Sequence, residues 1–186
     1  QRTGYGGGMA IKSDGTLWTW GSQGTYGALG LNARLVKQSS PTQVPGTWST
    51  ASIEEDNGMG VKSDGTLWTW GRNNVCGELA DGTTIDRSSP VQVGTDTTWS
   101  KTFGQQGLAG GPFAAMKTDG TLWAWGANNH GACGQNNRTQ YNSPVQIPGT
   151  TWSKLTGGYD MMASIRTDGT LWVWGGNYEG QLGLNQ

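Results

Sequence analysis

Short runs of alternating apolar and polar residues, bounded by Gly, Asp and Pro, follow one another along the chain. The clearest run is Thr16 to Trp20, which comes directly after Asp14-Gly15. An Asp-Gly pair between two apolar runs indicates a β-hairpin, and we expect a type I′ turn, in which both central residues have positive φ. The pattern therefore predicts paired antiparallel strands at Met9 to Lys12 and at Thr16 to Trp20.

Alternation along the second of these strands places side chains on both faces of a sheet. Trp18 and Trp20 fall on one side, and Leu17 and Thr19 fall on the other. Because neither side is fully polar, we expect both faces of the sheet to be covered. No apolar period of 3.6 residues appears, which excludes a helical solenoid.

The segment from Asp14 to Gly21 recurs three times with one variable position. Its copies begin at Asp14, Asp64, Asp119 and Asp168, at spacings of 50, 55 and 49 residues. Around these copies we count fourteen extended segments, including a Ser-Pro-x-Gln segment and a Trp-Ser segment in each complete unit. Several short strands repeated at this period are typical of an all-β fold, a β-propeller built of four-stranded blades.

The repeat resembles that of a known family. The segments from Ser143 to Leu155 and from Asp168 to Gly175, and the loop Gly175 to Gly183, are similar to the regulator of chromosome condensation (RCC1) repeat. The resemblance extends over residues 1–186 and implies a seven-bladed propeller, of which about four repeats are present. We expect one propeller domain here, incomplete at one or both ends. The Trp-rich version of the repeat is similar to bacterial and phage members.

The resemblance implies that the protein binds other proteins. Propellers of this family serve as interaction platforms, and one branch is a nucleotide exchange factor for a small GTPase. The exchange role is not carried over to this chain, because no basic tail is present and its loop residues do not define that surface.

Composition narrows the classes of partner. A formal charge of −1 and a pI near 5.7 argue against binding to nucleic acid, which normally needs clustered Lys and Arg. No apolar run approaches the roughly 18 residues that cross a bilayer, so no membrane insertion is expected. The low charge and the abundance of Gly, Thr, Ser, Asn and Trp favour an extracellular or virion setting.

The sequence contains no recognisable catalytic or metal-binding constellation. His130 is the only histidine, and neither a nucleophile motif nor an orienting acid accompanies it. Cys76 and Cys133 are the only cysteines, and Cys133 takes the place that Leu29 and Leu79 hold in other repeats, as a core residue would. We therefore predict that the protein is not an enzyme and has no cofactor or metal. An enzyme remains conceivable only if a domain outside this sequence supplies the chemistry.

The recurring acids and tryptophans are interpreted as scaffold. Each repeated Asp lies in a hairpin turn, and all 11 Trp belong to recurring segments, eight in Leu-Trp-x-Trp and three in Trp-Ser. A Trp that recurs in register is explained by packing between blades. Exposed aromatic side chains also stack on sugars, which leaves a carbohydrate-binding propeller on a secreted protein or a virion as the alternative function.

Function is expected where the repeat does not explain the residues. The acidic turn of Glu54, Glu55 and Asp56 corresponds to Gly158-Tyr159-Asp160, and it is either a solvated turn or a binding site. Residues 104–112 form a Gly-rich insertion, and the loops after each Trp-Gly differ from one another. The predicted binding residues are Glu54, Glu55, Asp56, Tyr26, His130, Tyr159, Asp160, Tyr178 and Glu179. They predict a non-enzymatic protein-interaction platform.

Overall fold

The chain forms β-strands joined by turns and loops. The computed structural model describes residues 7–22, 24–54, 56–73, 76–103, 111–158 and 160–184. Within these residues there are thirteen strands and no helix that could span a membrane. The strands are β1 (Gly7–Ile11), β2 (Thr16–Ser22), β3 (Lys37–Ile53), β4 (Asn57–Lys62), β5 (Leu67–Gly71), β6 (Arg87–Gln92), β7 (Trp99–Phe103), β8 (Pro112–Lys117), β9 (Leu122–Gly126), β10 (Tyr141–Gln146), β11 (Trp152–Gly157), β12 (Met161–Arg166) and β13 (Leu171–Gly175).

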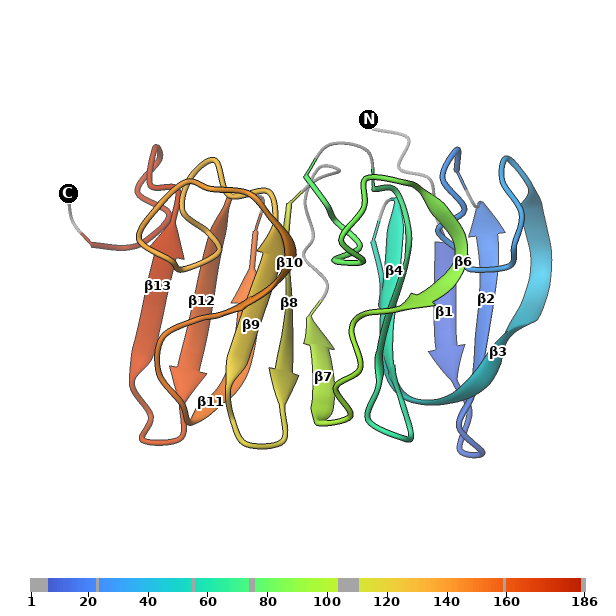
Figure 1. Cartoon of the computed structure of the whole chain (residues 1–186), viewed down its shortest axis with the longest axis horizontal. Helices are drawn as coiled ribbons and strands as arrows, with labels where there is room; N and C mark the ends of the chain where they lie inside the picture. Colours follow the sequence, from blue (N-terminus) through green and yellow to red (C-terminus); the bar gives the residue numbers. More distant parts are fainter. Residues whose placement is uncertain are drawn as a thin grey trace.

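The strands form four antiparallel blades that stand side by side in chain order (Figure 1). Blade 1 contains β1, β2 and residues 37–44 of β3, and blade 2 contains residues 48–53 of β3 with β4, β5 and β6. Blade 3 contains β7 to β10, and blade 4 contains β11, β12 and β13. The prediction of an all-β fold built of blades is confirmed.

One strand fewer is present among the described residues than the fourteen segments predicted. The difference lies in β3, a continuous strand that pairs with β2 as far as Thr47 and with β4 from Trp48 onward. Trp48 follows Thr47 directly, so no linker separates the two pairings, whereas residues 93–98 link β6 to β7. The chain therefore stays extended and joins blades 1 and 2 into a six-stranded sheet.

The hairpin turns are in place, but their predicted type is wrong. Gly15 has a φ of 81°, whereas Asp14 is not among the residues with positive φ. The Gly15 N–H donates to the Lys12 carbonyl, and the Lys12 N–H donates to the Thr16 carbonyl, both at 2.9 Å. This is a three-residue loop with a left-handed glycine forming a bulge, not a type I′ turn. The Asp side chain has a different role.

Each turn aspartate anchors the tryptophan that follows it. Asp64 Oδ1 accepts hydrogen bonds from the N–H (3.0 Å) and the hydroxyl (2.6 Å) of Thr66. The Thr66 hydroxyl in turn accepts from Trp68 Nε1 at 2.8 Å. The same relay occurs in the other three copies, and in each copy the Thr hydroxyl is the main cause that lowers the pKa of the Asp carboxyl. The recurring acids are structural, as predicted.

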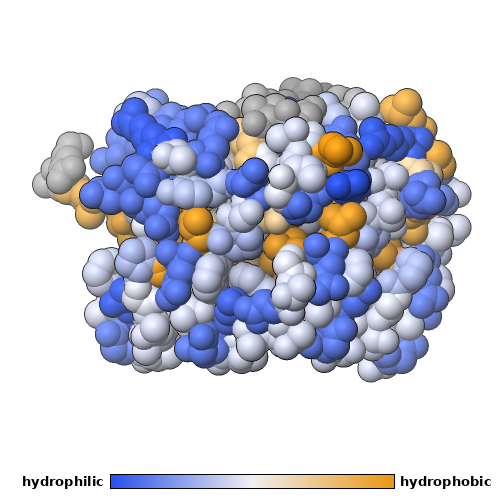
Figure 2. All heavy atoms as spheres, viewed as in Figure 1, coloured by the Kyte–Doolittle hydropathy of each residue, from blue (hydrophilic) through white to orange (hydrophobic). Residues whose placement is uncertain are grey.

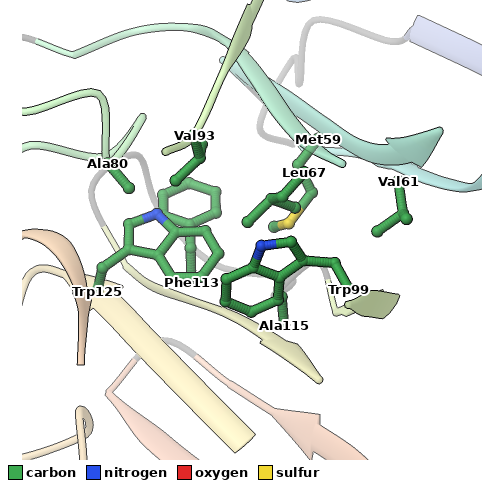
Figure 3. Close-up of a cluster of buried hydrophobic side chains, with 9 residues drawn as sticks. All are labelled: Met59, Val61, Leu67, Ala80, Val93, Trp99, Phe113, Ala115 and Trp125. Atoms are coloured by element: carbon green, nitrogen blue, oxygen red, sulfur yellow. The ribbon is translucent and has the colours of Figure 1, made fainter. Parts of the chain in front are cut away.

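The hydrophobic core is divided into clusters between adjacent blades. Between blades 2 and 3, Figure 3 shows Trp99 and Trp125 of blade 3 turned toward Leu67 and the other apolar side chains of blade 2. Corresponding clusters lie between blades 1 and 2 and between blades 3 and 4. Both faces of the inner blades are therefore covered, as predicted.

In blades 2, 3 and 4 the second Trp of the Leu-Trp-x-Trp segment joins its blade to the preceding one. Nε1 of Trp70 donates to the Ala28 carbonyl at 2.7 Å, and Trp125 and Trp174 make the equivalent bond to the blades before them. Trp70 crosses β4 directly above Gly58, where an added Cβ would lie 2.3 Å from the indole ring. With the Trp70 ring in this position, a Cβ at residue 58 would collide with it.

The two ends of the blades differ in chemistry. The Asp-Gly turns lie along the lower edge in Figure 1, and the loops after each Trp-Gly lie along the upper edge. On the face in view, Figure 2 shows a hydrophilic to neutral lower edge and separate apolar patches above it. We call the upper edge the rim.

Candidate functional site

Buried asparagines shape the rim loops. Asn73 is fully buried and receives a hydrogen bond on Oδ1 from the Leu79 N–H (3.0 Å), while its amide donates to Asp81 and the Thr83 carbonyl. Asn128 and Asn177 hold their loops in the same way, because the Oδ1 of each accepts a hydrogen bond from a loop N–H, that of Cys133 and that of Leu182 respectively. The loops are rigidly supported at their base, so that the residues at their tips have defined positions.

The first cluster of candidate residues lies at the junction of blades 3 and 4. His130 Nδ1 lies 2.9 Å from Asp160 Oδ1, an ion pair by distance that lacks the alignment of a hydrogen bond. The Tyr178 ring meets the imidazole edge-on, with 5.1 Å between centroids. His130, Asp160 and Tyr178 belong to three different loops, and the structure brings these three predicted residues together.

This junction cluster borders open space. A pocket of about 240 Å³ is lined by His130, Tyr178, Arg138 and the backbone of residues 175–177. A larger pocket of about 560 Å³ begins at His130 and Arg138 and continues to Trp172. Tyr178 is 71% exposed, so its ring is accessible to a partner.

A second cluster occupies the junction of blades 1 and 2. Arg72 Nη1 lies 3.8 Å from Asp56 Oδ2, and the guanidinium lies over the Tyr26 ring at 5.5 Å from its centroid. The Asp56 side chain is only 11% exposed. The sequence left two interpretations of the acidic turn, a solvated turn or a binding site. The first is wrong for Asp56, because its side chain is buried beside the Arg72 guanidinium.

The two clusters are equivalent in the repeat. Tyr26 and His130 each precede the loop glycine of one blade, and Asp56 and Asp160 each precede the second strand of the next blade. The carbonyls of both acids also accept the same backbone hydrogen bond, from Arg72 and Gly176 respectively. These two junctions thus each combine an aromatic ring with a carboxylate and a basic group, and the identities of the residues differ between them.

Two of the remaining predicted residues, Glu54 and Glu179, are held by hydrogen bonds of their backbone N–H groups. Glu179 lies on the rim, where its N–H donates to Gln181 Oε1 at 2.8 Å, and the Glu54 N–H donates to the Asn57 carbonyl. Glu55 and Tyr159 lie outside the described residues, as do residues 104–110 of the predicted insertion. Across the described ranges no three His, Cys, Asp or Glu side chains converge as metal ligands would.

Sequence reasoning missed two basic residues at these junctions and one buried acid. Arg72 and Arg138 are single substitutions within variable loops, so periodicity did not distinguish them. Glu78 is fully buried in the loop of blade 2, where Oε2 lies 3.3 Å from the Cys76 N–H. A lone acid in a polar loop gives no sequence signal of burial.

A repeated cation between tryptophans was also missed. Lys62 Nζ lies 3.5 Å from the centroid of Trp68 and 5.3 Å from that of Trp48. Lys117 and Arg166 are placed in the same way in blades 3 and 4. The signal was present, because a basic residue precedes every Asp-Gly turn by two positions. The rings of these tryptophans are therefore in contact with a cation of their own blade, which supports their interpretation as scaffold.

Both cysteines are free and buried. Cys133 is fully enclosed in the cluster between blades 3 and 4, as its correspondence to Leu29 predicts. Burial raises the pKa of the Cys133 thiol to about 12 and also raises that of Cys76. Low thiolate content makes both thiols poor nucleophiles, so neither provides a reactive centre.

Comparisons with known proteins agree with this repeat architecture. The family model described as the regulator of chromosome condensation (RCC1) repeat matches residues 14–53 and 119–163. These two segments carry the RCC1 repeat, and the chain as a whole has the fold of propeller blades. No curated protein matches the sequence significantly.

Solved structures share the fold over nearly the whole chain. Human WBSCR16 aligns with a TM-score of 0.80 at 23% identity, covering 97% of this chain and 48% of that one. Prp20p of Saccharomyces cerevisiae aligns with a TM-score of 0.78 at 19% identity, covering 97% and 44%. A second yeast structure, of RCC1 (Prp20) bound by Kap60, gives 0.74 at 20% identity, covering 97% and 44%. The RCC1-type blades described here span about half the length of these structures.

Proposed function

We propose that these RCC1-type blades form a non-enzymatic module that binds another protein through its rim. The observation that carries the proposal is the cluster of His130, Asp160 and Tyr178, where variable residues from three loops meet beside an open pocket. Tyr and Arg are enriched at the centres of protein interfaces, and both are present here, as Tyr178 and Arg138.

The solved neighbours support the same class of function. The yeast structures are described as binding Gsp1p and histones and as bound by Kap60, all of which are proteins. We infer protein binding for this chain from the shared fold together with its own rim. Its partner must differ in detail, because recognition depends on loops that the low identity leaves dissimilar.

A site-specific photo-crosslinker tests both the class of partner and the surface. A photoreactive phenylalanine analogue would replace Tyr178 on the rim, and the matched control would carry it at Ser13 in the Asp-Gly turn at the opposite edge. We expect a protein adduct at position 178, competed by unlabelled protein, and none at position 13. The captured protein, once purified, should bind the unmodified chain saturably.

Two outcomes would overturn the proposal. Equal capture at positions 178 and 13 would show that the rim is not the binding surface. Saturable binding to a glycan array, lost on Tyr178→Ala, with no protein adduct would favour the carbohydrate-binding alternative.

A further inference from the structure

A cation lies between two tryptophan rings in each of blades 2, 3 and 4, and in blade 3 it also meets an acid. Lys117 Nζ donates to Asp96 Oδ2 at 2.5 Å while it lies over the Trp99 and Trp123 rings. Asp96 belongs to residues 93–98, which link β6 to β7. A charge that is partly removed from water needs a partner of opposite charge. In blade 3 the chain itself supplies that partner.

Lys62, the equivalent cation of blade 2, has no such acid among the described residues. Its Nζ lies over the Trp68 and Trp48 rings, and it takes part in none of the ion pairs of the described chain. The acid closest in sequence, Asp64, has its Oδ1 bound to Thr66. Burial lowers the pKa of the Lys62 ammonium, and the charge of Asp64 offsets this effect only in part. The ammonium is therefore partly desolvated without a direct partner of opposite charge.

The difference arises in the segment that precedes the Trp-Ser strand of each blade. Thr47 and Thr98 are equivalent, because the carbonyl of each accepts a backbone hydrogen bond from the residue after the cation, at 3.0 and 2.8 Å. Two residues before them stand Pro45 and Asp96 respectively. Proline has no acidic group. The place of the Asp96 carboxylate is thus taken in blade 2 by a side chain that cannot pair with Lys62.

Pro45 and Lys62 line an open cleft between blades 1 and 2. The cleft has a volume of about 450 Å³, which is within the usual size of ligand-binding sites. Trp68 and Pro90 add apolar walls, and the Gln43 amide can donate to and accept from peptide groups. Of the described residues that line the cleft, Lys62 alone is charged. An anion that enters would meet a cation and no competing acid on these walls.

From these observations we propose that the cleft between blades 1 and 2 binds an acidic side chain, Asp or Glu, of a partner protein, and that Lys62 Nζ donates to its carboxylate. The bond between Lys117 and Asp96 is the same contact made within the chain. The acid belongs to a protein, because the polypeptide on either side of it can contact the apolar walls and hydrogen-bond to Gln43. The cleft is distinct from the two rim clusters, and the inference does not rest on the proposed function.

A pair of short peptides tests the inference on the full 186-residue chain. The first is acetyl-Gly-Thr-Asp-Thr-Thr-amide, which carries the residues that surround Asp96, and the second has Asn in place of Asp. Carbon NMR of the lysine Cε groups would follow both binding and the pKa of Lys62, with the exposed Lys101 as internal reference. We expect saturable binding of the Asp peptide and binding at least about fivefold weaker for the Asn peptide, because a charge-assisted hydrogen bond is lost.

The pKa of Lys62 provides a second readout. A carboxylate beside the ammonium favours its charged form, so the bound Asp peptide should raise the pKa of Lys62 and leave that of Lys101 unchanged. Lys62→Met removes the charge and keeps an unbranched side chain, and it should weaken binding of the Asp peptide at least about fivefold. Lys101→Met is the matched control and should bind as the unmodified chain does. If Lys62→Met fails to fold, the two peptides on the unmodified chain still decide the question.

Four results would refute the proposal. They are no saturable binding at millimolar Asp peptide, equal binding of the Asp and Asn peptides, an unchanged pKa of Lys62 at saturation, or a folded Lys62→Met variant that binds as tightly as the unmodified chain. Acetate serves as a further probe. If acetate bound at Lys62 as tightly as the Asp peptide, the cleft would hold a free anion only, which contradicts the assigned occupant.

Discussion

At the residue scale, side chains that recur in the repeat satisfy backbone groups or fill space between blades. Thr69 illustrates this role, since it is fully buried and its hydroxyl donates to the Leu79 carbonyl at 2.6 Å. Its partner belongs to the rim loop ten residues further along. A side chain on the Leu-Trp-x-Trp strand therefore holds the loop that shapes the rim.

Replacing Thr69 with Val tests this contact. Val keeps the volume of Thr but leaves the buried carbonyl without its donor, which should lower the free energy of unfolding by about 1–2 kcal/mol. Urea denaturation would measure the change. Thr47→Val, at an exposed position of β3, should alter stability by less than about 0.5 kcal/mol, and equal losses in the two variants would contradict the role of the bond.

Asp96 provides a residue-scale test of pH dependence. The Lys117 ammonium, 2.5 Å away, and the Thr98 hydroxyl lower the pKa of the Asp96 carboxyl from 3.8 to about 2. Because the folded-state pKa is below the unfolded value, the stabilisation is present above about pH 4 and is lost as the pH falls toward 2. The difference in unfolding free energy between the unmodified chain and Asp96→Asn should therefore shrink between pH 5 and pH 2. A constant difference across that range would refute the pairing.

At the scale of the element, strand positions and hairpin pairing could be predicted because alternation and Asp-Gly turns are local signals. The turn type could not, because Asp14 contributes through its side chain and not through a left-handed backbone. The fusion of two expected strands into β3 also escaped prediction, since it depends on how close the next blade packs.

Packing of Trp70 across Gly58 is the element-scale feature most sensitive to substitution. An added methyl group would lie 2.3 Å from the ring, so Gly58→Ala should destabilise the fold by about 1–3 kcal/mol through overpacking. Gly158→Ala is the matched control, because its Cβ would meet only Met161 at 3.9 Å. Thermal unfolding of both variants provides the comparison, and a Gly58→Ala protein as stable as Gly158→Ala would show that the ring relaxes without cost.

At the scale of the whole molecule, blades stabilise one another through the leucine that opens each Leu-Trp-x-Trp segment. Leu17, Leu67 and Leu122 are fully buried, whereas Leu171 on the outer face of blade 4 is 66% exposed. The three buried residues each pack in a cluster between blades. The same repeat position therefore has a different energetic value in the last blade.

This difference predicts unequal effects of one substitution. Leu122→Ala should cost about 2–5 kcal/mol, as removal of a buried leucine does, while Leu171→Ala should change stability by less than about 0.5 kcal/mol. Denaturant titration of the two variants compares them directly. A large loss at Leu171 would mean that its face is covered in solution.

Sequence and structure differ most in how they define the site. Periodicity separated His130, Asp160 and Tyr178 from the scaffold, but only the stacking of blades 3 and 4 brings them together. Arg72 could not be found, because its contact with Tyr26 across a junction has no counterpart in sequence spacing. Arg138, which lines both pockets, is a single substitution in a variable loop. The seven-bladed ring, the bacterial or phage character and the extracellular setting stay predictions.

The central claim is that recurring residues maintain the blades while variable rim residues bind the partner. Its most direct test is the affinity of the protein captured at position 178 for two variants of this chain. Tyr178→Ala should weaken binding at least about tenfold, equivalent to about 1.4 kcal/mol, with an unchanged melting temperature. Asp168→Ala, in the turn at the opposite edge, should lower the melting temperature and leave the affinity unchanged. The reverse pattern, or equal affinities for both variants, would contradict the account.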